Sequence, residues 1–178
     1  MKNILIFSGS PRKNGNSDIL CDQFMAGARE AGHNVEKIWV PGEKIAPCLG
    51  CGHCQSHAGE CVQKDAMADI LQKMVEADVL VLASPVYFYS VNAQIKALID
   101  RTVARYTEIK KKGMYYIITA ADSDISRMER AIECFRGFAF CLEGSVEKGV
   151  VYGVGAWNKG EIKALPSMAQ AYEMGKNS

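Results

Sequence analysis

The sequence predicts an α/β domain built on a doubly wound, five-stranded parallel sheet. Short apolar segments alternate with longer segments of helical period five times along the 178 residues. The segment Val79–Ala83 is apolar at every position, which is typical of a central strand covered on both faces. No repeat, linker or low-complexity tract interrupts this alternation. We therefore expect residues 1–178 to form a single domain.

The first strand and helix follow directly from the start of the chain. Residues 2–8 form an apolar run of strand length. The Asn14-Gly15 turn comes next, and either Asn16 or Ser17 can cap the helix that follows it. This β–turn–α unit is the first of the alternating pairs.

The middle of the chain holds two further strands, at 35–40 and 79–83. Residues 41–64 between them lack any period, so we interpret them as a cysteine-rich insertion loop. Asp65 is predicted to cap the next helix. The apolar residues of that helix recur at helical spacing, namely Met67, Ile70, Leu71, Met74 and Val75.

The last part of the chain continues the pattern. In order, we expect a loop at 84–90, a helix over 95–103, a strand at 115–119, a helix over 128–142, a strand at 146–154 and a short helical tail after Pro166.

Charge and composition exclude several classes of partner. The net charge is +1, from 21 basic and 20 acidic residues, so no long-range field favours nucleic acid or an acidic membrane surface. No stretch approaches the ~20 apolar residues of a membrane span, and the first residues lack the pattern of a secretory signal. Seven cysteines without an export signal favour a reducing compartment. We expect a cytoplasmic protein.

The segment Ser8–Ser17 has the character of an anion-binding turn. It follows a strand and opens a helix, where free backbone N–H groups and the positive helix end favour a phosphate. It is neither a P-loop nor a G-x-G-x-x-G turn, so a terminal phosphomonoester fits better than a pyrophosphate. The candidate phosphate ligands are Ser10, Arg12, Asn16 and Ser17. An ordinary polar turn is the alternative.

The segment Ser84–Ser90 carries three aromatic residues after the most hydrophobic strand. Such residues in a rim loop suit a flat, mostly apolar ring, although they could equally cap the core. Ligands of doubly wound sheets bind beyond the carboxyl ends of the strands. We expect the loops 8–16, 84–90 and 119–125 to meet there, with the cysteine loop on the same rim.

Four cysteines form a C-x2-C-x2-C-x6-C run, at Cys48, Cys51, Cys54 and Cys61. The spacing is compatible with a [4Fe–4S] cluster, with a zinc site of four thiolates or of three with His53 or His57, with a redox dithiol or labile disulfide, or with a chance cluster. The remaining three, Cys21, Cys134 and Cys141, lie on predicted helices and are expected to be buried.

The Ser-Gly-Ser-Pro-Arg-x-x-Gly-Asn-Ser start and the Ser-Pro-Val-Tyr segment resemble the flavodoxin-like NAD(P)H-dependent FMN reductases. The cysteine run and residues 151–161 are more similar to the iron–sulfur flavoproteins of that superfamily. The resemblance implies a flavodoxin-like fold with strand order 2-1-3-4-5, and a homodimer or a tetramer of dimers with the flavin near an interface. It also implies bound FMN and a [4Fe–4S] cluster on the four cysteines.

The same resemblance assigns the flavin contacts by position. It puts the phosphate at Ser10, Arg12, Asn16 and Ser17, and Thr119 beside the ring as a weaker contact. It puts the isoalloxazine against the whole aromatic segment, which comprises Pro85, Val86, Tyr87, Phe88, Tyr89 and Ser90. Trp157 could shield the flavin or the cluster.

The function that follows is an FMN-dependent oxidoreductase in which the cluster passes single electrons to FMN, from a donor such as ferredoxin, toward an unspecified small-molecule acceptor. One alternative is an NAD(P)H-dependent FMN or quinone reductase without a cluster, and another is an electron carrier without enzymatic activity. No acid–base pair or nucleophile stands out, and a flavin needs none because it carries the electrons itself.

Overall fold

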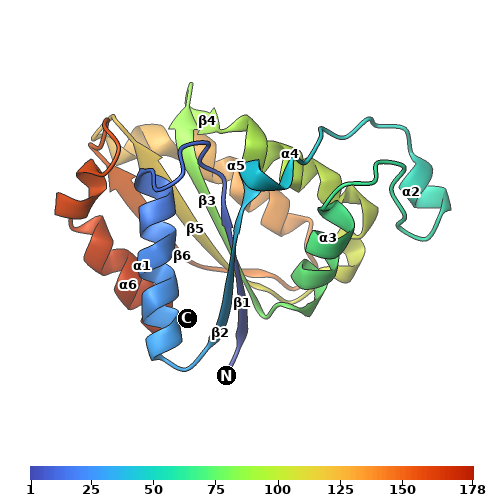
Figure 1. Cartoon of the computed structure of the whole chain (residues 1–178), viewed down its shortest axis with the longest axis horizontal. Helices are drawn as coiled ribbons and strands as arrows, with labels where there is room; N and C mark the ends of the chain where they lie inside the picture. The colour runs from blue at the N-terminus through green and yellow to red at the C-terminus, as the bar shows by residue number, and fades with distance from the viewer.

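The computed structural model describes all 178 residues and has a central parallel sheet (Figure 1). Its parallel strands lie in the order β2-β1-β3-β5-β6. Their bounds are β1 Asn3–Ser8, β2 Asn34–Trp39, β3 Val79–Tyr87, β5 Gly113–Ala120 and β6 Val146–Val154. Counted by themselves, these five strands have the predicted order 2-1-3-4-5. The flavodoxin-like doubly wound sheet is therefore confirmed.

The predicted loop at 84–90 is wrong, because this segment continues the sheet and then turns back. Ser84 and Pro85 still pair with β5, and β4 (Ser90–Val91) pairs antiparallel with the end of β3. The turn between them holds Phe88 and Tyr89 at φ values of 49° and 61°. Two successive left-handed residues match the right-handed twist of a tight hairpin, although bulky residues rarely adopt them.

Helices cover both faces of the sheet. One face carries α1 (Asn16–Glu30) and α6 (Ser167–Lys176), which approach closely at Gly27 and Gly175. The other carries α3 (Met67–Glu76), α4 (Ala93–Arg101) and α5 (Glu129–Phe140). A four-residue helix α2 spans His53–Ser56, and short 3-10 helices lie at Val40–Glu43, Thr102–Ala104, Tyr106–Glu108, Ile125–Met128 and Glu161–Ala164.

The core has two layers, one on each face of the sheet. In β3, Leu80 and Leu82 pack in the layer under α3, α4 and α5, whereas Val79, Val81 and Ala83 pack under α1 and α6. A central strand covered on both faces is therefore confirmed. None of the helices combines the length and apolarity needed to cross a membrane.

The other cysteines follow the helix boundaries. Cys21 is buried in α1 as predicted, and Cys134 is half-buried. Cys141 is exposed, so the prediction that it is buried is wrong. The reason is that α5 ends at Phe140, one residue before it.

The cysteine loop leaves the carboxyl end of β2 but does not stay on the rim with the other loops. It extends sideways beyond α3, at the right of Figure 1, and α2 lies against the 3-10 turn that follows α4. The expectation that all four loops share one rim is therefore wrong for this loop. A buried ion pair at its base, described below, explains where it is anchored.

Candidate functional site

The first loop presents an uncapped helix end. Helix α1 starts after Gly15, and no side chain caps its free N–H groups. A Cβ atom on Gly15 would lie 2.7 Å from the Arg12 carbonyl oxygen and 3.0 Å from Ser10 Oγ, so the turn is too tight for any other residue. Arg12 itself is exposed and forms no ion pair. The turn can thus offer both backbone donors and a free guanidinium to an anion.

A buried carboxylate supports this loop from below. Asp18 accepts hydrogen bonds from Ser8 Oγ at 2.8 Å, from the backbone N–H of Asn14 at 2.8 Å and from Lys37 Nζ at 2.9 Å. Burial raises the pKa of the Asp18 carboxyl, but these hydrogen bonds outweigh burial and leave the pKa lowered. Asp18 is therefore ionised and fixes the loop, while Lys37 balances its charge.

Asn16 ties the first loop to the segment after β6. Its Nδ2 donates to the carbonyl oxygens of Ala156 at 3.2 Å and Asn158 at 3.0 Å, and its Oδ1 accepts from the N–H of Gly160 at 2.8 Å. Both N–H donors of the side-chain amide are used by these bonds. Only the backbone N–H of Asn16 is left to face a phosphate.

These loops line an open cavity of about 410 Å³ at the carboxyl edge of the sheet. Six of the eleven predicted flavin-contact residues line it, which are Arg12, Asn16, Pro85, Val86, Tyr87 and Thr119. The cavity thus joins the phosphate loop, the start of the hairpin and the end of β5, as the sequence predicted.

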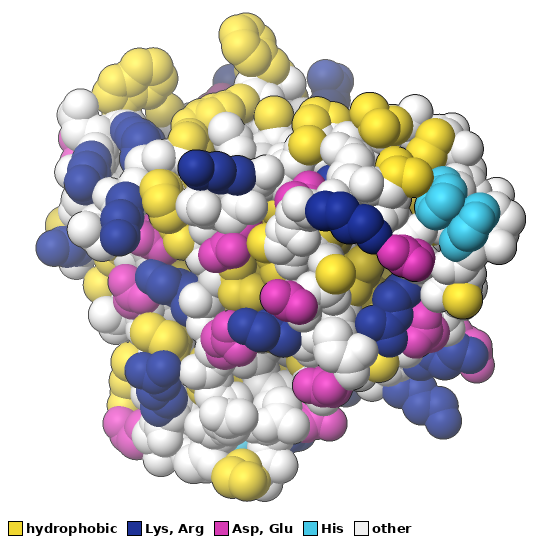
Figure 2. All heavy atoms as spheres, turned by 45° about the vertical axis from the view of Figure 1, so that its right-hand side comes forward, with side chains coloured by type: hydrophobic (Ala, Val, Ile, Leu, Met, Phe, Trp, Pro, Cys, Tyr) yellow, Lys and Arg dark blue, Asp and Glu magenta, His cyan; other side chains and the backbone are white.

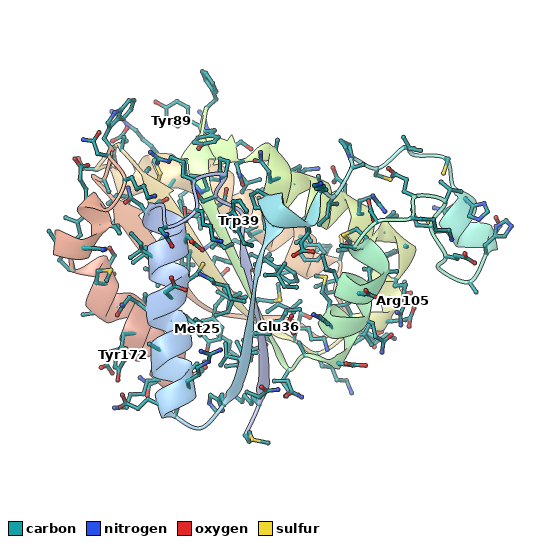
Figure 3. All side chains as sticks on the ribbon, in the orientation of Figure 1. Met25, Glu36, Trp39, Tyr89, Arg105 and Tyr172 are labelled. Atoms are coloured by element: carbon teal, nitrogen blue, oxygen red, sulfur yellow. The ribbon has the colours of Figure 1, made fainter.

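The other five predicted residues lie outside that lining. Ser10 and Ser17 are buried beneath it, where Ser17 Oγ is 2.8 Å from Thr119 Oγ1. Phe88 and Ser90 are exposed on the hairpin. Tyr89 projects away from the sheet at the top of the molecule (Figure 3), and the guanidinium of Arg130 lies 5.9 Å from its ring centroid.

The segment 156–159 also lines the cavity, and of its residues sequence reasoning considered only Trp157 and missed Ala156, Asn158 and Lys159. Glu161 holds it in place by accepting from the N–H groups of Trp157 and Asn158, both at 2.8 Å. Trp157 is largely exposed over the cavity, and Lys159 adds a second cation. The position of this segment after the carboxyl end of β6 is the signal that could have placed it here.

A second cavity, of about 210 Å³, brings the predicted metal residues together. All four cysteines of the run line it as free thiols, together with Arg101 from α4. No group of three or more His, Cys, Asp or Glu side chains is arranged to hold a metal ion. His53 also lines this cavity and stacks on His57 with ring centroids 3.7 Å apart. Figure 2 shows two adjacent histidine side chains (cyan) below a row of side chains of the hydrophobic class (yellow).

Both the first loop and the hairpin lie within a match to a known protein family. The sequence pattern of the NADPH-dependent FMN reductases matches residues 2–146 of the chain. The chain belongs to this family. The match to this family of flavin-dependent oxidoreductases includes the cysteine loop but ends before the segment 156–159.

Among curated proteins, iron–sulfur flavoproteins are similar in sequence to part of this chain. An iron–sulfur flavoprotein of Archaeoglobus fulgidus is 41% identical over 107 residues, covering 60% of this chain and 48% of that protein. One of Methanosarcina thermophila is 40% identical over 96 residues, covering 54% and 50%. The chain thus spans about half the length of these curated relatives. Among solved structures, an FMN-dependent NADH-azoreductase of Bacillus anthracis in complex with FMN has the same fold, with a TM-score of 0.75, 16% identity and 99% coverage of both chains.

Proposed function

We propose that this FMN reductase family member binds FMN in the cavity at the carboxyl edge of the sheet and acts as an FMN-dependent oxidoreductase. The observation that carries the proposal is the uncapped start of α1, which opens beside Arg12 into a cavity flanked by Tyr87 and Trp157. FMN, when bound, supplies hydride and single-electron transfer.

The residues around the cavity suit the two ends of that cofactor. The free N–H groups of α1 and the guanidinium of Arg12 hold the phosphate, with Lys159 as a second cation. The buried hydroxyls of Ser10 and Ser17 fix the turn. Tyr87 and Trp157 both line the cavity, where their aromatic side chains would shield a flat ring from water.

We further propose that the four cysteines hold a [4Fe–4S] cluster. The donor set and the shared cavity support this, as do the names of the relatives. Gly50 and Gly52 have φ values of 63° and 71°, which glycine adopts readily, so the backbone can turn sharply between the closely spaced cysteines. The cluster, when bound, supplies single electrons.

The partners of this activity belong to the proposal as well. We propose ferredoxin or NAD(P)H as the donor and a small molecule as the acceptor. Location in the cytoplasm and a homodimer or a tetramer of dimers stay predictions.

The family name favours a second candidate, direct reduction of FMN or quinones by NADPH without a cluster. Protein purified without oxygen separates the two by its visible spectrum together with its iron, sulfide and zinc per FMN. We expect flavin bands over a broad shoulder, with about four irons and four sulfides per chain.

Two variants assign the metal to the loop. Cys51→Ser removes a cysteine of the cavity, whereas Cys141→Ser removes an exposed cysteine outside it. Loss of iron in the first variant only, with FMN retained in both, supports the cluster. Flavin alone in the native protein, with steady NADPH turnover, would make the second candidate correct.

A further inference from the structure

The base of the cysteine loop contains a buried cation. The side chain of Arg101, at the end of α4, is only 1% exposed, and its guanidinium forms a two-pronged ion pair with Asp65. Nη1 donates to Asp65 Oδ2 at 2.7 Å, and Nη2 donates to Oδ1 at 2.9 Å. A buried charge is costly unless it is paired in this way, so the position of Arg101 is tightly specified.

The partners of this guanidinium lie at the two ends of the cysteine loop. Nη1 also donates to the carbonyl oxygen of Ala46, two residues before Cys48, at 2.9 Å. Asp65 follows the last cysteine by four residues, and its carboxylate accepts from the N–H groups of Ala46 at 3.4 Å and Met67 at 3.1 Å. One ion pair therefore joins the start of the loop, its end and α4.

The same guanidinium borders the cysteine cavity. Arg101 lines the cavity with the four cysteines, and its Nε–H is buried without a hydrogen-bond partner. Cys61 lines this cavity and the neighbouring one together with Arg101, so its sulfur is the cysteine sulfur that shares both cavities with the guanidinium. A buried donor without a partner costs free energy, and a thiolate at this cavity would satisfy it.

We propose that Arg101 is a positioning residue for the cysteine site, which closes the ends of the loop and donates an N–H···S hydrogen bond to Cys61. Its action on a cluster depends on the proposed function, but its hold on the loop does not. A hydrogen bond to a ligand sulfur stabilises the more negative state of a cluster and therefore raises its reduction potential. Arg101 is thus expected to affect both iron retention and potential.

The first test compares Arg101→Gln with Arg136→Gln in the FMN-loaded protein purified without oxygen. Arg136 is the matched control, because it forms ion pairs with glutamates on α5 and β6 and lines neither cavity that Arg101 borders. We expect Arg101→Gln to weaken iron retention against a chelator ~10–100-fold and to lower the midpoint potential, and Arg136→Gln to change neither. If iron retention and the midpoint potential are the same in the two variants, the proposed effect of Arg101 on the cluster is wrong.

The second test needs no iron. In FMN-loaded, iron-free protein, hydrogen exchange over residues 47–64 should be faster in Arg101→Gln than in the native chain, with β1 and the flavin cavity unchanged. Unchanged exchange in the loop overturns the proposal. If the native chain binds no iron, but the loop still exchanges faster in Arg101→Gln than in the native chain, the cluster is refuted and the anchoring role is supported. If Arg101→Gln does not fold, Arg101→Lys keeps the charge, loses the two-pronged geometry and serves the same comparison.

Discussion

Replacing Arg12 by alanine tests where the FMN phosphate binds. Arg12 has no carboxylate partner and borders the cavity, so its guanidinium is free to contact a phosphate dianion. A hydrogen bond to a charged group contributes ~1.5–3 kcal/mol. Because Arg12 is exposed to solvent, we take the lower end, and ~1.5 kcal/mol corresponds to about tenfold weaker binding of FMN. Flavin fluorescence quenching during titration of the FMN-free protein measures the dissociation constant.

Lys13→Ala is the matched control. It removes the same charge one residue away, but Lys13 lies over Trp39, with Nζ 5.7 Å from the ring centroid, and does not line the cavity. The general electrostatic field changes almost equally in the two variants, so only a direct contact separates them. Tenfold weakening confined to Arg12→Ala supports the placement. Equal losses in both variants, or no loss in either, would refute it.

Three further variants test the supports of the fold and the site. Asp18→Asn should lower the free energy of unfolding by ~3 kcal/mol, the low end for a broken buried pair, because Lys37 keeps Asp22 as a partner. The pKa of Asp18 is lower in the folded protein than in the unfolded chain, where it is about 4. In urea titrations, the stability difference between the native protein and Asp18→Asn should therefore be largest above about pH 4. It should shrink as the pH falls through the pKa of Asp18 in the folded protein. Asn16→Ala removes three hydrogen bonds at ~1 kcal/mol each, so hydrogen exchange over 155–161 should rise. Lys112→Met leaves two carbonyl oxygens of the α3 end without their donor and should cost ~2 kcal/mol in thermal unfolding, with FMN affinity unchanged.

The fold was predictable because its signals are local. The continuous apolar run of β3 and the helical spacing after Asp65 each follow from neighbouring residues, and both elements form as predicted. The end of β3 was not predictable in the same way. The sequence of Pro85 and the aromatic residues after it predicts a loop. The segment stays in the sheet because it pairs with β5 and β4, which no local pattern indicates.

The candidate site was predictable only where the chain itself brings the residues together. Arg12 and the start of α1 are adjacent in sequence, so their joint role follows from the turn. The bonds of Asn16 reach a segment about 140 residues away, and no local pattern indicates them. No sequence pattern singled out Arg101 either, because the partner that compensates its buried charge is Asp65, 36 residues before it.

The two proposed redox sites rest on separate buried ion pairs. Asp18 with Lys37 fixes the phosphate loop, and Arg101 with Asp65 fixes the cysteine loop. Such pairs often add little net stability, so we interpret their place at the base of each loop by the geometry that they impose. The two cavities share no lining residue, so perturbations of the two pairs should be independent.

That independence gives a last prediction. Asp18→Asn should alter FMN affinity and leave iron retention unchanged, whereas Arg101→Gln should do the reverse, and the double variant should show the sum of both free-energy changes. Titration of FMN and iron release to a chelator, measured on the same four proteins, make the comparison. Iron lost from Asp18→Asn at the rate seen for Arg101→Gln would mean that the loops are coupled through the sheet and that each pair supports both sites.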